Sequence, residues 1–347
     1  MTRLKTSIGR TELKNPVIAG SAEHLIDADG VRRALRAGVG AVVVKSINET
    51  ERGRDQLQRA EYMLFDSDWR EIPWTADAPA EAFMATRSGL TPQTFEAWLE
   101  QTVALDREAK AMDSYAIASL IVADLTTAVG FAKQVEQAGV RVLELNIGTP
   151  YASQARGVVS TELEPERVTA IVSAVRAAIR IPLWVKITGQ SERVPDLAAA
   201  AFAGGGEAVV MAGRLLGLIP DVETLAPHLG TTLGVGGVWN LPLTCHWLTV
   251  SRQQVGKDKP LIGINGARTG LDVARMMLAG ASAVELASQV MLRGSAVLSE
   301  AVAELDAYLA RKGMNAAELI GVAADQRKTF PEMPLRTDNW RKYVSEG

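Results

Sequence analysis

Short apolar runs alternate with amphipathic segments along most of this chain, and this alternation constrains the fold more than any other feature. The apolar runs are nearly continuous in Val, Ile, Leu and Ala, which is typical of parallel strands covered on both faces. Predicted strands lie at 15–20, 40–46, 115–122, 142–147, 181–188, 207–213, 260–266 and 282–288, and predicted helices at 27–38, 92–112, 124–139, 162–179, 191–203, 241–255, 269–279 and 296–312. Eight strand–helix units are the number that closes a (β/α)8, or TIM, barrel.

We expect one α/β domain over residues 1–347. A β-hairpin is predicted at 4–14, before the first barrel strand. An insertion at about 47–92, after the second strand, breaks the alternation and is predicted to be an irregular lid, because long irregular insertions are usually lids or binding loops. A less regular region runs up to residue 234, and a C-terminal tail at about 313–347 is expected to wrap the surface.

Composition excludes several classes of protein. The formal net charge is −3 without a basic block, so nucleic-acid binding is not expected. The longest apolar runs stay below the roughly 18 residues of a membrane span. A single cysteine, Cys245, excludes intrachain disulfides and cysteine-ligated clusters, and with three scattered histidines we expect no metal site. The N-terminus lacks the apolar segment of a signal peptide, so a cytoplasmic enzyme is expected.

Polar residues follow the predicted strands at the ends where a barrel carries its active site. Lys45 and Lys186 end two different strands, and Asn146 ends a third, just before the break at Gly148. A buried ammonium is costly without a partner. Either one lysine reaches out of the barrel mouth, or both face one anionic or electron-rich ligand.

Small residues at the last strand ends predict a phosphate-bearing ligand. Asn265-Gly266 follows the seventh strand and Ala287-Ser288 the eighth, and Gly234-Val-Gly236-Gly237 forms a third small-residue loop. Glycine lets backbone N–H groups approach a phosphate closely. Neither a pair of carboxylates at the strand ends nor a Ser–His–Asp set is apparent, which suits a barrel whose cofactor carries the chemistry.

Taken together, the motifs resemble the class 1 dihydroorotate dehydrogenases and the flavin domain of dihydropyrimidine dehydrogenase over about residues 4–310. The matching motifs are Asn15-Pro16, Ala19-Gly20-Ser21, Lys45-Ser46, Glu144-x-Asn146-x-x-x-Pro150, Val185-Lys186, Gly234-x-Gly236-Gly237, Asn265-Gly266 and Thr269-Gly270. The resemblance implies FMN at the top of the barrel, hydride transfer between flavin N5 and a ring C–C bond, a place in pyrimidine metabolism, and a homodimer.

The resemblance also implies residue roles. Lys186 would stabilise the negative charge of reduced FMN, and Lys45 would lie close to both flavin and substrate. The expected FMN-binding residues are Ala19, Gly20, Ser21, Lys45, Ser46, Ser119, Asn146, Lys186, Gly236, Gly237, Asn265, Gly266, Ala287 and Ser288.

The chain departs from the family at substrate-facing positions. Thr149 stands where the family has a Cys or Ser general base, so Thr149, with Lys45, is the expected catalytic residue, although a hydroxyl needs a proton relay. Tyr151 and Thr86 replace asparagines that would touch the substrate. The expected substrate-binding residues are Lys45, Thr86, Asn146 and Tyr151. Each lost amide would leave a polar group of orotate unpaired, at about 1–3 kcal/mol.

Four functions remain open. The first is an FMN-dependent oxidoreductase that acts on a ring C–C or C=C bond of a small cyclic, pyrimidine-like substrate, with proton transfer by a loop hydroxyl. The second is a genuine dihydroorotate dehydrogenase with an altered pocket. The third is a flavin-binding subunit that needs a partner for electron transfer. The fourth is a flavin-free, phosphate-binding barrel.

Overall fold

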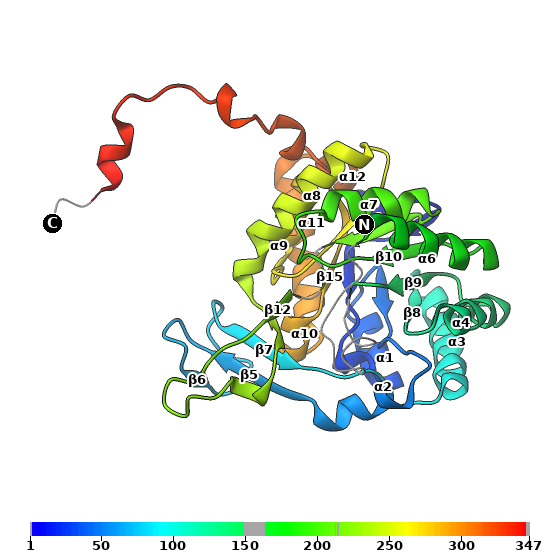
Figure 1. Ribbon diagram of the computed structural model, residues 1–347. Coiled ribbons are helices and arrows are strands. Elements are labelled where there is room, and N and C mark those ends of the chain that lie inside the picture. Colours follow the sequence, from blue (N-terminus) through cyan, green and yellow to red (C-terminus); the bar gives the residue numbers. More distant parts are fainter. Residues whose placement is uncertain (1, 149–163, 212, 214, 345–347) are drawn as a thin grey trace.

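Eight parallel strands close a barrel in the computed structural model, which describes residues 2–148, 164–211, 213 and 215–344. Helices surround this barrel (Figure 1), so the predicted TIM barrel is confirmed. In chain order the strands are β3 (Val17–Ala19), β4 (Ala41–Val43), β8 (Ala116–Ile121), β9 (Leu143–Asn146), β10 (Leu183–Lys186), β11 (Ala208–Met211), β14 (Leu261–Ile264) and β15 (Ala281–Leu286). Each strand pairs with its sequential neighbour, and β15 pairs with β3 to close the barrel.

The predicted barrel helices are all present. They are α1 (Ala28–Arg36), α3 (Phe95–Ala111), α4 (Leu125–Gln137), α6 (Pro165–Ala178), α7 (Val194–Ala203), α8 (Leu241–Val255), α9 (Gly270–Leu278) and α11 (Ala296–Lys312). Side chains that accept hydrogen bonds from backbone amides cap the N-termini of several of these helices. The Asp124 carboxylate accepts a hydrogen bond from the Thr127 amide at 2.8 Å, and the Thr269 hydroxyl accepts one from the Asp272 amide at 3.2 Å.

Two apolar cores hold the barrel together. One lies between the strands and the helices, and the other fills the barrel interior with residues such as Trp184 and Val210. The hairpin of β1 (Thr6–Ile8) and β2 (Thr11–Leu13) contributes Ile8 and Leu13 to the interior core. The predicted hairpin is therefore confirmed, and it covers the amino end of the barrel. The opposite end remains available for a site.

The insertion at 47–92 is not irregular, which corrects the expectation. It contains α2 (Glu51–Asp55), β5 (Glu61–Phe65), β6 (Glu71–Ile72) and β7 (Phe83–Arg87). These strands join β12 (Leu215–Gly217) and β13 (Leu233–Gly236) in an antiparallel sheet of order β12-β13-β7-β5-β6. The expected loop at 234–237 is therefore a strand up to Gly236. Partners about 150 residues away complete this sheet, and periodicity within one segment cannot reveal such pairings.

Both faces of this sheet are apolar, which explains why its strands lack a simple alternation of polar and apolar residues. Phe65 and Ala85 pack with Leu233 on one face. Leu64 and Met84 pack on the other face, where Leu292 of α10 (Ser288–Arg293) joins them. The sheet is therefore anchored to the carboxyl end of the barrel.

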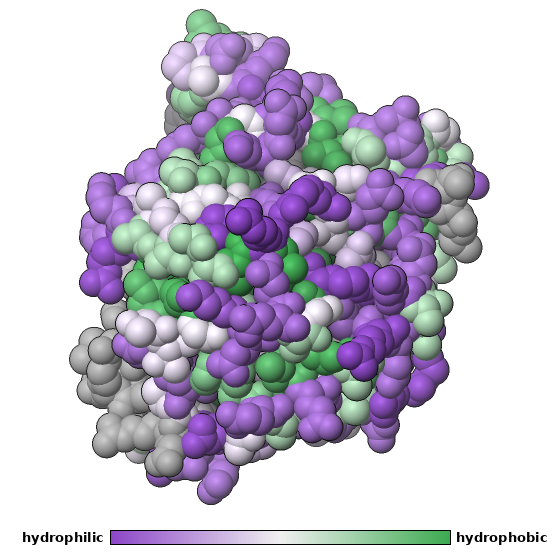
Figure 2. All heavy atoms as spheres, turned by 90° about the vertical axis from the view of Figure 1, so that its right-hand side faces the viewer, coloured by the Kyte–Doolittle hydropathy of each residue, from purple (hydrophilic) through white to green (hydrophobic). Residues whose placement is uncertain are grey.

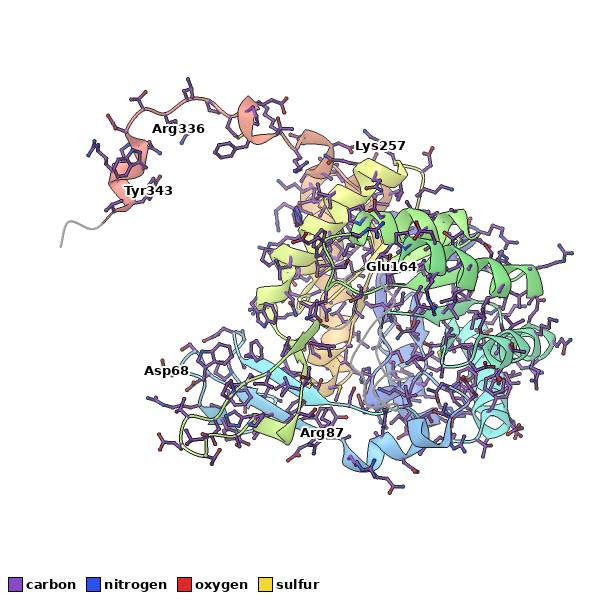
Figure 3. The ribbon with its side chains drawn as sticks, viewed as in Figure 1. Asp68, Arg87, Glu164, Lys257, Arg336 and Tyr343 are labelled. Carbon is purple, nitrogen blue, oxygen red and sulfur yellow. The ribbon has the colours of Figure 1, made fainter. Side chains whose placement is uncertain are left out.

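The C-terminal tail divides into two parts. Residues up to 326 pack on the barrel through α12 (Ala316–Leu319) and through an ion pair between Arg252 and Asp325, with Nε and Oδ1 3.2 Å apart. Residues 327–344, here called the arm, leave the body, so the expectation that the whole tail wraps the surface is wrong (Figure 1). Arg336 and Tyr343 lie on this arm away from the barrel (Figure 3), and Leu335 is 99% exposed.

The outer surface mixes hydrophilic and apolar side chains on the face that carries α3, α4 and α6 (Figure 2). Among the described residues, none of the helices has the length and apolar character needed to cross a membrane.

Candidate active site

A cavity of about 1040 Å³, counted with its open mouth, lies at the carboxyl ends of the barrel strands. Its wall combines the barrel with the antiparallel sheet. Lining residues from the barrel and its loops include Ser21, Glu23, Lys45, Ser46, Asn146, Lys186, Asn265, Gly266, Glu285, Ala287 and Ser288, and those from the sheet include Tyr62, Met84, Thr86, Gly234 and Gly236. A cavity in this place is where barrel enzymes bind their ligands.

Lys45 is held in place by three different contacts just beyond β4. Its Nζ lies 3.2 Å from Glu23 Oε1, its backbone N–H donates to Leu25 O at 3.1 Å, and its carbonyl accepts from Trp98 Nε1 at 3.0 Å. Burial raises the pKa of Glu23, but the Lys45 charge and hydrogen bonds outweigh it, so the pKa lies below its usual value. The Lys45 ammonium is therefore held by Glu23, and both residues belong to the cavity lining.

Lys186 at the end of β10 meets two carboxylates inside the barrel. Its Nζ lies 2.8 Å from Glu144 Oε2 and 2.8 Å from Glu285 Oε2. Glu144 comes from the neighbouring strand β9, whereas Glu285 reaches in from β15 across the barrel. The expectation that no carboxylates are paired near the strand ends is therefore wrong. Of the two alternatives for the lysines, the one in which a lysine reaches out of the barrel mouth is wrong, because each is about 5% exposed.

Burial and neighbouring charges shift the pKa values of this cluster in different directions. Burial alone would lower the Lys186 pKa, but the two carboxylates outweigh it and raise the pKa above its usual value. Burial raises the pKa of Glu285 to about 8; Lys186 opposes this rise and Glu144 adds to it. A carboxyl group with this pKa keeps its proton at neutral pH.

A chain of hydroxyl groups links the cluster to the next strand ends. Ser119 Oγ donates to Glu144 Oε1 at 2.9 Å, and Ser46 Oγ lies 2.8 Å from Ser119 Oγ. Because the Ser119 proton is used for Glu144, the Ser46 hydroxyl must donate to Ser119. Ser21 Oγ donates to Val44 O at 3.0 Å and accepts from the Ser46 amide at 3.2 Å. These contacts fix the orientation of each hydroxyl.

The turn after β14 shows why Asn-Gly is needed there. Asn265 has a φ of +77°, and its Nδ2 donates to Gly213 O at 2.9 Å. Gly266 has a φ of +95°, and a Cβ at this position would lie 2.3 Å from the Leu241 amide nitrogen. Glycine is the residue that tolerates both the conformation and the close approach. The turn brings backbone groups to the cavity wall.

Most of the predicted site residues come together, although not all of them reach the cavity. The residues that line it are Ser21, Lys45, Ser46, Thr86, Asn146, Lys186, Gly236, Asn265, Gly266, Ala287 and Ser288. Ala19, Gly20, Ser119 and Gly237 are not part of the described lining; Ala19 and Ser119 are fully buried behind it. Thr149 and Tyr151 lie outside the described residues.

Sequence reasoning missed Glu23, Glu144 and Glu285 as parts of the site. A signal for Glu144 was present, because residues two apart on a strand face the same side. Glu144 stands two positions before Asn146, so both face the barrel interior. Glu23 lies four residues after β3, in the connection to α1, and its contact with Lys45 becomes visible only in the fold.

Comparisons with known proteins agree with the fold and with the motifs. Residues 70–309 match the family described as dihydroorotate dehydrogenase. The chain is 27% identical over 325 residues to the dihydroorotate dehydrogenase B (NAD(+)), catalytic subunit, of Methanothermobacter thermautotrophicus, covering 93% of this chain and 99% of the relative. It is 30% identical to dihydroorotate dehydrogenase A (fumarate) of Lactobacillus helveticus, covering 88% and 94% of the two chains.

A solved structure of dihydroorotate dehydrogenase from Eimeria tenella, in complex with ferulenol, has the same fold. Its TM-score is 0.72 at 18% identity, over 94% of this chain and 90% of that one. The family match covers more than half of the chain, and enzymes of this family are FMN-dependent flavoproteins that act on CH–CH groups. The chain therefore belongs to the dihydroorotate dehydrogenase family of oxidoreductases, as its motifs predict.

Proposed function

We propose that this chain is an FMN-dependent oxidoreductase that acts on a ring C–C or C=C bond of a small cyclic, pyrimidine-like substrate. The observation that carries the proposal is the cavity into which Lys45, Asn146 and Lys186 bring cationic and amide groups from three barrel strand ends. Both ammonium groups are held in the cavity lining by carboxylate partners, and positive charge in this place favours a ligand that is electron-rich or gains negative charge.

The residues present fit FMN. Gly236 lines the cavity, and a Cβ there would meet no other atom within 4 Å, so its backbone faces open space. The Asn265-Gly266 turn and Ala287-Ser288 offer further backbone groups where barrels hold phosphate. Lys186 supplies a cation on the barrel side of the cavity. We propose that these residues, with Ser21, Lys45, Ser46 and Asn146, hold the cofactor.

When bound, FMN would supply the hydride chemistry. The residues of the chain would orient the substrate and move its proton. In this proposal Lys45, oriented by Glu23, and Asn146 orient the substrate ring. Thr86 of the sheet adds a hydroxyl to the cavity wall, and this hydroxyl lies 3.3 Å from Gly234 O. Thr149, as a loop hydroxyl, moves the proton, and Tyr151 contacts the substrate.

Spectroscopy and turnover test the proposal together. The purified protein should show flavin absorbance, or gain it on reconstitution with FMN, and the flavin should be bleached by the substrate or its reduced form. Lys186→Gln should weaken FMN binding about 10-fold or more, since it removes a charge-assisted contact worth about 1.5–3 kcal/mol. A protein that takes up no FMN would overturn the proposal.

A genuine dihydroorotate dehydrogenase is the second candidate. It is favoured by the full-length match to relatives that carry this name. Dihydroorotate-dependent reduction of an artificial dye separates the two candidates. Turnover with dihydroorotate supports the second, and turnover only with less polar cyclic compounds supports the first.

We also propose that the chain works with further subunits. The relative from Methanothermobacter is named a catalytic subunit, which suggests a separate electron-transfer partner for this chain as well. A homodimer is proposed from the same family membership. Light scattering of the isolated chain tests the dimer, and a comparison of turnover with NAD(+), fumarate and a dye tests the need for a partner.

A further inference from the structure

We propose that Glu285 holds a proton in the working enzyme and, acting through Lys186, helps to set the reduction potential of the bound cofactor. This inference rests on the proposed function, since it concerns a flavin beside Lys186. Glu285 is a positioning residue here: it acts on the cofactor through the charge and the orientation of the lysine.

The first argument is the charge of a closed cluster. Glu144, Lys186 and Glu285 form a group in which one ammonium faces two carboxyl groups, each at 2.8 Å. Both carboxyl side chains are 0% exposed, and the lysine side chain is 6% exposed. With both carboxyl groups ionised, the cluster would carry a net negative charge without solvent, which is costly. One proton shared by the carboxyl groups makes the cluster neutral.

The second argument decides which carboxyl group holds the proton. Glu144 is stabilised as a carboxylate because Oε1 accepts a hydrogen bond from Ser119 at 2.9 Å while Oε2 faces Lys186. Glu285 has contacts at one oxygen only: Oε2 accepts a hydrogen bond from Lys186 at 2.8 Å, and among the described residues no donor reaches its buried Oε1. Among the same residues Glu144 Oε2 makes no hydrogen bond either, but it lies 2.8 Å from the Lys186 ammonium, so both oxygens of Glu144 face a positive or donating group. Burial and the Glu144 charge both raise the pKa of Glu285, against the effect of Lys186. The proton therefore belongs on Glu285.

Among the described residues, Lys186 is the cation that acts on the pKa of Glu285. Gly20, from β3, leaves room for the side chain, since a Cβ there would lie 3.0 Å from Glu285 Oε2. The charges that act on its pKa are Lys186 from β10 and Glu144 from β9. Lys45, the other buried lysine of the site, is paired with Glu23.

Glu285 and Lys186 both belong to the cavity lining, and the Glu285 carboxyl group lies behind the lysine, 2.8 Å from its Nζ. A neutral Glu285 leaves the Lys186 charge balanced by Glu144 alone. An ionised Glu285 adds a negative charge where reduction also places one, and this repulsion lowers the potential. Proton binding by Glu285 and electron uptake by the cofactor therefore favour one another, and the proton comes from solvent without any bond to the cofactor.

The test measures the reduction potential of the bound flavin against pH, from about pH 6 to about pH 10, for the natural protein, Glu285→Gln and Glu285→Asp. The glutamine variant cannot ionise, whereas the aspartate variant can. We expect the natural protein and Glu285→Asp to show an additional fall in potential as the carboxyl group ionises, and Glu285→Gln to lack it. Glu300→Gln, an exposed glutamate paired with Arg293, is the control and should match the natural protein. Parallel curves for the natural protein and Glu285→Gln would overturn the proposal.

A second measurement needs no cofactor. At neutral pH the protein should show the infrared band of a buried neutral carboxylic acid, which disappears with alkaline titration and is missing in Glu285→Gln. Absence of this band in the natural protein overturns the proposal. If the protein shows the band but binds no FMN, the proposed function is wrong, whereas the protonation of Glu285 is supported.

Discussion

Lys45 Nζ lies 3.2 Å from Glu23 Oε1, and this contact joins the lysine after β4 to a short 3-10 turn at Glu23–Leu25. The side chains are 6% and 15% exposed, so solvent screens the pair only weakly. Glu23→Gln removes the negative charge and should lower the free energy of unfolding by about 1–3 kcal/mol in urea titrations. Glu300→Gln breaks an exposed ion pair and should cost less than about 1 kcal/mol.

The pH dependence of this effect has a defined sign. The folded-state pKa of Glu23 lies below its usual value of 4.5, so its ion pair contributes stability above that pH. The contribution is lost as the pH falls through the folded-state pKa. The difference between the natural protein and Glu23→Gln should therefore shrink in acid, and a difference that grows in acid would contradict this account.

Glu285→Gln should change stability in the opposite pH range. The pKa of Glu285 is about 8 in the folded state against a usual 4.5, so the natural protein loses stability between these pH values as the unfolded chain releases the proton first. Relative to the natural protein, Glu285→Gln should gain stability from about pH 4.5 to about pH 8 and then hold a constant difference, on the order of a few kcal/mol. Denaturant unfolding at several pH values measures this, and a pH-independent difference would contradict it.

Gly266→Ala should be more damaging than Gly256→Ala. Both glycines have a positive φ, +95° and +98°, so each substitution carries backbone strain of about 1 kcal/mol. At Gly256 a Cβ would meet nothing within 4 Å, whereas at Gly266 it would lie 2.3 Å from the Leu241 nitrogen. We expect Gly266→Ala to lose at least about 2 kcal/mol of stability and to weaken FMN binding. Equal losses in the two variants would show that the close approach does not matter.

Deleting residues 328–347 should leave the barrel intact. Phe330 is 91% exposed, and Arg327, which donates to Gln253 Oε1 at 3.0 Å, is retained in this deletion. The free energy of unfolding measured in urea should change by less than about 0.5 kcal/mol. A loss of stability that depends on protein concentration would instead assign the arm to an interface between subunits. The deletion thus also tests whether the proposed homodimer uses the arm.

The barrel could be predicted from sequence because each of its strand–helix units is encoded locally. The run at 181–188 and the following helix show their periodicity within a short window, and so do the other units. The antiparallel sheet could not be predicted in this way. Thr86 in β7 pairs with both Tyr62 and Gly234, and neither partner is visible from the pattern around Thr86 itself.

In the site, the ends of the predicted strands indicated where side chains such as Lys186 lie, but not which carboxyl groups they contact. Lys186 and Asn146 reach the cavity because barrel strands point their ends there. Lys186 donates a hydrogen bond to Glu285, which is 99 residues further along the chain. Ion pairs of this kind depend on side-chain distances across the barrel, and a single sequence does not contain those distances.

The pairing of β7 with β13 has a consequence for how the protein is made. Met84 lies opposite Gly236, so this wall of the cavity cannot form until the chain has been synthesised well past the middle. Contacts between residues this far apart in sequence form slowly, because closing the intervening loop costs entropy. During synthesis the edge of β7 that pairs with β13 remains open until β13 emerges. FMN capture should consequently be a late step, after most of the barrel strands have left the ribosome.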